Sequence, residues 1–181
     1  MDNKRYLGML YWEVGTPKNI DINLHKAQNV YRELYDQDLK LPSKEYNPDM
    51  VRDLRHLTDS YVTFGDFTDA LWAARKTFDY DREHGQDNKQ PLAIDWNNLG
   101  MTYFLSGSVQ SDPKERKANF DHAELCYKQA EATFRAQKST ASLAANLFNQ
   151  SLLARDRGDY REGERLDKAA RATLADAQEE Q

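Results

Sequence analysis

Apolar and aromatic side chains recur at helical spacing along most of this chain, and short breaks that contain glycine or proline separate the amphipathic stretches. Four times, one such stretch is followed by a glycine and then by a second stretch. Long runs rich in Ala, Leu, Glu, Lys and Arg favour helix over sheet. The pattern predicts an all-α chain whose helices cover about 3–14, 21–39, 49–64, 67–84, 91–106, 114–136, 139–157 and 160–177.

The breaks inside each pair of helices share a turn chemistry. Gly65 and Gly158 are each followed by an aspartate and then an aromatic residue, and Gly15 and Gly107 hold the same place in the other two pairs. Glycine enters the left-handed region at low cost and suits a helix C-cap, while aspartate suits the N-cap of the next helix. Each break therefore predicts a tight helix-turn-helix.

Positions on either side of these turns repeat, and one unit carries a complete signature. Trp96 to Tyr103 reads W-N-N-L-G-M-T-Y, which is the W-x2-L-G-x2-Y pattern of tetratricopeptide repeats. Over nearly its whole length the chain resembles that superfamily. The resemblance implies one domain, 1–181, folded as a right-handed α-solenoid of about four helix-turn-helix TPR-like repeats. The repeats would cover about 1–44, 45–90, 91–138 and 139–181.

The repeat is longer than in the common members of the superfamily. Extra residues at about 16–24 and 108–119 lie between a turn glycine and the small residue of the following helix. Without them the period is near 42 residues, similar to the long repeats of kinesin light chain and of bacterial peptide-pheromone receptors. Extra residues in repeat proteins often cluster on the binding face. Here they are equally well explained as spacers.

The resemblance also implies where a partner binds. In such repeats the first helix of each pair lines a concave groove, so the chain is expected to bind a peptide or protein segment there, as part of a larger regulator or scaffold. The matching positions are Arg52, Arg55, Asn97, Asn98, Met101, Phe104, Asn149, Leu152 and Arg155.

Each chemical type in this set has a functional and a structural interpretation. Asn98 and Asn149 occupy the same place in successive repeats, and an amide can both donate to and accept from a peptide backbone. The alternative is that the asparagines are solvated or bridge neighbouring helices. Arg52 and Arg55 lie three residues apart and could hold a carboxylate, or they pair with acidic neighbours in the chain. Phe104 is either an aromatic anchor or a core residue.

Composition narrows the function further. The 25 basic and 30 acidic residues give a net charge of −5, which argues against a broad nucleic-acid footprint. No apolar run is long enough to span a membrane. The single cysteine, Cys126, and the absence of a signal peptide favour the cytoplasm. Cys126 is expected to be a buried small residue rather than a nucleophile.

No catalytic motif is present. The four histidines are scattered, and no phosphate-binding, dinucleotide-binding or serine-hydrolase motif occurs, so no catalytic residue, cofactor or metal site is predicted and the chain is expected not to be an enzyme. The alternative to groove binding is a structural module that forms homo-oligomers through its terminal helices, driven by exposed apolar surface there.

Overall fold

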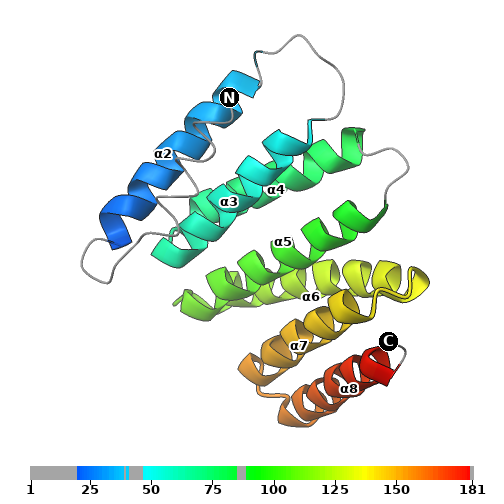
Figure 1. The fold of residues 1–181 in the computed structure, drawn as a ribbon. Coiled ribbons are helices and arrows are strands. Elements are labelled where there is room, and N and C mark those ends of the chain that lie inside the picture. Colours follow the sequence, from blue (N-terminus) through cyan, green and yellow to red (C-terminus); the bar gives the residue numbers. More distant parts are fainter. Residues whose placement is uncertain (1–19, 39, 41–46, 85–88, 180–181) are drawn as a thin grey trace. The chain divides into compact units, whose positions relative to one another are not determined.

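The computed structural model describes residues 20–38, 40, 47–84 and 89–179, and within them the chain is helical with no strand (Figure 1). This confirms the all-α prediction. The helices begin and end within a few residues of the predicted ranges. The expected helix at 3–14, Gly15 and residues 16–19 of the 16–24 insertion lie outside the described residues, and residues 20–24 form the first turn of α2. The helices are α2 (Ile20–Asp38), α3 (Pro48–Phe64), α4 (Phe67–His84), α5 (Lys89–Val109), α6 (Pro113–Ala136), α7 (Thr140–Asp156) and α8 (Tyr160–Glu179).

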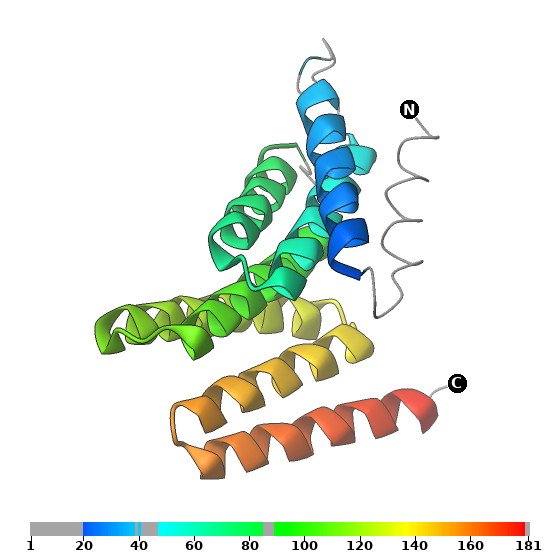
Figure 2. The same ribbon diagram turned by 90° about the vertical axis from the view of Figure 1, so that its left-hand side faces the viewer.

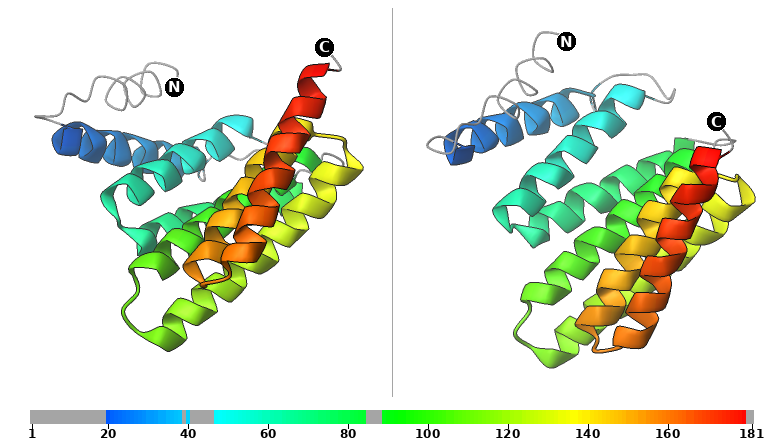
Figure 3. Two further views of the ribbon diagram at one scale, coloured as in Figure 1. Left: turned by 90° about the horizontal axis from the view of Figure 1, so that it is seen from below. Right: turned by 60° about the horizontal axis from the view of Figure 1, so that its bottom comes forward.

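The chain divides into two compact units, 1–84 and 85–181. In the first, α3 packs on both α2 and α4. In the second, α5–α6 and α7–α8 form two antiparallel hairpins that lie side by side, with α7 against both helices of the preceding hairpin (Figures 2 and 3). A single domain over 1–181 and a right-handed superhelix through all four repeats stay predictions.

Two of the predicted turn glycines do what the sequence indicates. Gly65 and Gly158 have φ of +74° and +86°, the left-handed conformation that ends α3 and α7. The aspartates that follow them cap the next helices: a side-chain oxygen of Asp66 accepts from the Asp69 N–H at 3.3 Å, and Asp159 does the same for the Glu162 N–H at 3.1 Å. The local sequence therefore sets both turns.

The prediction for Gly107 is wrong. This glycine lies inside α5, which continues to Val109, and a Cβ there would come within 2.6 Å of the Phe120 ring on α6. Its role is close helix packing instead of a turn. The turn falls at 110–112, where Asp112 caps α6 ahead of Pro113 as predicted. The 108–119 insertion thus lengthens both helices of the hairpin.

Each unit has its own apolar core. In the second unit the signature glycine, Gly100, lets α6 approach so closely that a Cβ would meet the Tyr127 ring at 2.8 Å. Cys126 is buried beside it, as predicted. Further along, Phe104 and Phe120 stack with ring centroids 6.0 Å apart. Fully buried core residues include Tyr31, Leu34, Leu54 and Leu57 in the first unit and Tyr127 and Phe134 in the second.

Candidate functional site

A cluster of amide side chains connects α5 to α7. The Asn97 Oδ1 accepts hydrogen bonds from the side-chain amides of Asn146 at 3.0 Å and Asn149 at 3.3 Å. The Gln150 amide donates to Asn146 Oδ1 at 2.8 Å and to Glu131 on α6 at 2.8 Å. Asn146 is completely buried and Asn149 is 9% exposed. We call Asn97, Asn146, Asn149 and Gln150 the amide junction, because together they link the two hairpins.

The predicted pair Asn98 and Asn149 is therefore not equivalent in the structure. Asn149 is turned into the amide junction, as the helix-bridging interpretation requires. Asn98 is half-buried and its side chain makes no hydrogen bond with the described residues; only its backbone oxygen is engaged, by the Thr102 hydroxyl at 2.9 Å. Within the described helices, Asn98 and Asn149 therefore differ in their surroundings: the side chain of Asn149 is engaged between hairpins and that of Asn98 is not.

The apolar candidates also separate into two groups. Met101 is 39% exposed, one helical turn from Asn98, and Leu152 is partly exposed on α7. Phe104 is only 8% exposed and stacks against Phe120 inside the α5–α6 hairpin. The structure places Phe104 in the core, so its surface is used within the hairpin.

Arg52 and Arg55 on α3 do not point their guanidinium groups at a common acceptor. Arg52 pairs with Asp49 at 2.6 Å, and both side chains are largely exposed. Arg55 pairs at 3.1 Å with Asp81 on α4, whose side chain is 2% exposed. The acidic partners are residues of the chain itself, and Arg55 compensates a buried carboxylate.

These arginines also set the protonation of their neighbours. Burial lowers the pKa of His56, and the charge of Arg52 lowers that pKa further; the imidazole stacks on Tyr31 with centroids 5.0 Å apart. Burial raises the pKa of Asp59, and the charge of Arg55 acts in the opposite direction. His56 therefore favours its neutral form more strongly than a solvated histidine.

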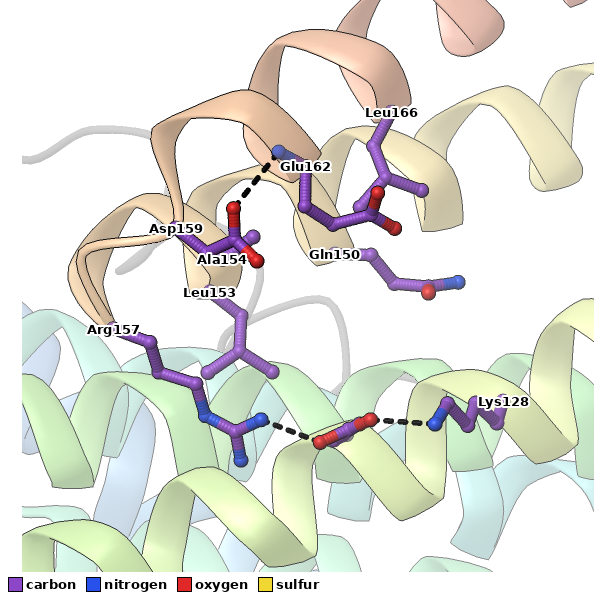
Figure 4. Close-up of a pocket in the computed structure, with 9 residues that line it drawn as sticks. Lys128, Gln150, Leu153, Ala154, Arg157, Asp159, Glu162 and Leu166 are labelled. Carbon is purple, nitrogen blue, oxygen red and sulfur yellow. Dashed lines mark hydrogen bonds and ion pairs between the residues drawn. The ribbon is translucent and has the colours of Figure 1, made fainter.

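A polar groove that the sequence did not predict lies where α6 faces the α7–α8 hairpin (Figure 4). Glu124 accepts from Lys128 at 2.5 Å and from Arg157, and these two hydrogen bonds hold the pKa of Glu124 below its usual value. Arg157 also pairs with Asp121 at 2.9 Å. The groove has a volume of about 230 Å³ with Leu153 at its wall. Glu124 is paired with both Lys128 and Arg157, and the contacts of Arg157 with Glu124 and Asp121 tie the end of α7 to α6.

A second groove, between α7 and α8, is apolar. We call it the α7–α8 groove; it has a volume of about 390 Å³ and is lined by Ala141, Ala144, Ala145, Phe148, Asp167, Ala170, Arg171 and Leu174. Phe148 and Leu174 are each 47% exposed. Arg155, a predicted partner residue, lies near one rim, with its guanidinium 3.9 Å from Asp167. Exposed large apolar side chains around a groove mark an interaction surface.

Across the helices that the structure describes, no group of three or more His, Cys, Asp and Glu side chains could hold a metal ion. None of those helices is both long and apolar enough to cross a membrane.

No protein-family model and no curated protein matches the chain. Two solved structures are similar to it in their helical arrangement. One, described as a kinesin light chain from Podosopora anserina with nearly identical TPR-like repeats, has a TM-score of 0.48 and 13% identity, over 98% of this chain and 96% of that one. BtubC (BKLC) from P. vanneervenii has a TM-score of 0.42 and 17% identity, over 98% of this chain and 80% of that one. The described part of the chain consists of helices that pair in antiparallel hairpins, and α5 carries the W-x2-L-G-x2-Y octet.

Proposed function

We propose that this chain is a protein-interaction module that binds an extended peptide segment along the exposed face of α5 and α7. The observation that carries the proposal is the unoccupied amide of Asn98 beside the exposed thioether of Met101. Residues three apart on a helix share a face, so one ligand can contact both. Leu152, at the place on α7 that matches Met101 on α5, extends the apolar contact to the next hairpin.

The chemistry of this face suits a peptide backbone with apolar side chains. The Asn98 amide can donate to a peptide carbonyl and accept from a peptide N–H at the same time. Met101 has a flexible, polarisable side chain that adapts to different partners. Arg155, 44% exposed at its side chain, can favour a carboxylate toward one end of the ligand.

The experiment is selection from a random peptide library on the immobilised full chain, followed by calorimetric titration of the selected peptides. We expect Met101→Ala to weaken binding about tenfold, since an exposed apolar contact that a ligand buries contributes about 1–2 kcal/mol. Asn98→Ala is expected to weaken binding about two- to tenfold through the lost hydrogen bonds. Leu125→Ala is the matched control, because Leu125 is exposed on α6 away from this face.

Peptides that bind wild type, Asn98→Ala and Met101→Ala with equal affinity would contradict the proposed site. The alternative predicted from the sequence, self-assembly through the terminal helices, requires exposed apolar surface on the last hairpin. The α7–α8 groove supplies such a surface; of the residues that the peptide would contact, Arg155 lies near its rim, and Asn98, Met101 and Leu152 are not among its lining residues.

A further inference from the structure

In the second unit, the packing of α7 on the α5–α6 hairpin shows which surface of a hairpin contacts the next helix. Helix α7 packs against α5–α6 and covers Ala93, Ala130 and Phe134 with its own Leu143 and Leu147. All five side chains are buried, and Phe134 is only 1% exposed. An apolar strip along both helices of one hairpin is therefore the docking surface for the next helix.

The same strip recurs on the last hairpin. The repeat register aligns Ala123 of α6 with Gly163 of α8, so Ala130 and Phe134 correspond to Ala170 and Leu174. Ala170 and Leu174 line the α7–α8 groove, so this groove is the counterpart of the strip that α7 covers on the preceding hairpin. The two strips differ in exposure at their large side chains, because Leu174 is 47% exposed where Phe134 is buried, while Ala170 is buried like Ala130. Within the described residues, no helix covers this groove as α7 covers the preceding one.

One difference between the two strips defines the chemistry of the helix that would cover the α7–α8 groove. Asn98 and Asn149 hold the same place in their repeats, so Phe148 corresponds to Asn97. Asn97 holds α7 through hydrogen bonds, whereas Phe148 offers a ring that is 47% exposed. The covering element must therefore be apolar where the inner junction is made of amides.

We propose that the cover is the same groove of a second copy of this chain, in a two-fold symmetric dimer. This rests on the self-assembly alternative and not on peptide binding. A second copy brings the required apolar helix, because Ala141, Ala145 and Phe148 are spaced four and three residues apart on one face of α7. In a two-fold arrangement each Phe148 meets the alanines of the other copy, so the bulky and small side chains are complementary.

The charges at the rim are paired within each copy. Arg171 is 78% exposed at its side chain and lies 3.2 Å from Asp167, and Arg155 lies 3.9 Å from the same carboxylate, whose side chain is 17% exposed. The apolar side chains of the groove, and not these charges, therefore carry the proposed contact.

The size of the groove sets the strength of the dimer. Eight residues line it, against roughly 20–30 on each side of a standard stable interface. The dimer is thus weak and concentration-dependent, with a dissociation constant on the order of 100 µM.

The test is sedimentation equilibrium of the full 181-residue chain from about 5 µM to about 1 mM, a range that brackets the expected constant. The average mass is expected to rise from monomer toward dimer. Leu174→Glu is expected to weaken association at least tenfold, and Phe148→Ser likewise. Leu125→Glu, which places the same charge at an exposed leucine of α6, is expected to leave it unchanged. Circular dichroism confirms that each variant is folded.

Cross-linking tests the symmetry separately. Ala145→Cys is expected to form a disulfide between two copies on mild oxidation, because the proposed packing of Phe148 on the alanines of the other copy places Ala145 close to the two-fold axis. A wild type that stays monomeric throughout overturns the dimer while leaving peptide binding untouched. A dimer that Leu174→Glu and Phe148→Ser do not weaken overturns the interface but keeps self-assembly. A dimer in which Ala145→Cys does not cross-link overturns the two-fold arrangement.

Discussion

Replacing Asn97 by alanine removes the one oxygen that accepts hydrogen bonds from two amides of α7. In the folded protein this oxygen lies 3.0 Å from the Asn146 nitrogen and 3.3 Å from the Asn149 nitrogen. Asn146 is completely buried, and its own oxygen stays engaged by Gln150. The substitution therefore leaves a buried N–H without a partner at the contact between the two hairpins.

The size of the expected loss in the free energy of unfolding follows from how deeply the two donors, Asn146 and Asn149, are buried. A buried donor without a partner costs about 1–3 kcal/mol, and this applies to Asn146 in full. Asn149 is 9% exposed, so water can replace its lost partner and only the net value of one hydrogen bond, about 0.5–1.5 kcal/mol, is lost. We expect Asn97→Ala to lower the free energy of unfolding by about 2–4 kcal/mol in total.

Urea unfolding followed by circular dichroism measures this loss, with a midpoint shift of about 1–2 M expected for a unit of this size. Hydrogen exchange of the α5 and α7 amides assigns the loss to the second unit. The control is Asn98→Ala, the same substitution at the next residue, where no side-chain hydrogen bond is broken and a change within about 0.5 kcal/mol is expected. Equal midpoint shifts for the two variants would refute the division between a structural and a ligand-facing asparagine.

Three further predictions follow from the packing and the charges. Gly100→Ala is expected to lower the melting temperature by several degrees. A Cβ 2.8 Å from the buried Tyr127 ring costs about 1–3 kcal/mol, which exceeds the gain in helix propensity of about 1 kcal/mol. An unchanged or higher melting temperature would contradict this prediction. Arg55→Ala is expected to cost about 2–4 kcal/mol in denaturant titrations, since it strands the buried carboxylate of Asp81, and Arg55→Lys should recover part of the loss. Burial lowers the pKa of His56 in the folded state, so the unfolded chain takes up the proton first as the pH falls from 7 to 5, and the free energy of unfolding decreases. His56→Gln should flatten that part of the curve of stability against pH. A curve that this substitution leaves unaltered would argue against the lowered pKa.

The helices and most turns are predictable because their signals are local. Asp112 and Pro113 start α6, and Gly65 ends α3, through contacts that span only a few residues. Gly107 shows where local reading fails. A glycine can serve a left-handed turn or a close helix approach, and only the position of Phe120 on the neighbouring helix decides between them.

The candidate site was predictable as a set of helix positions but not residue by residue. Asn97 and Asn98 are the same amino acid on consecutive positions, and one helical step of about 100° turns them to different surroundings. Which of the two meets α7 depends on the packing of the hairpins. Phe104 had two interpretations for the same reason, and the ring of Phe120, 16 residues later in the chain, selects the core.

The amide junction between the two hairpins and the α7–α8 groove differ in kind, because hydrogen bonds are directional and apolar burial is not. Hydrogen bonds from Asn146 and Asn149 to Asn97 require a single alignment of α7, so the amide junction fixes how the hairpins meet. A ring such as Phe148 gains from burial in many orientations and imposes no comparable register. The chain therefore uses a polar contact where two hairpins of one chain must stay in place. In the proposed dimer, the apolar α7–α8 groove would allow both association and release.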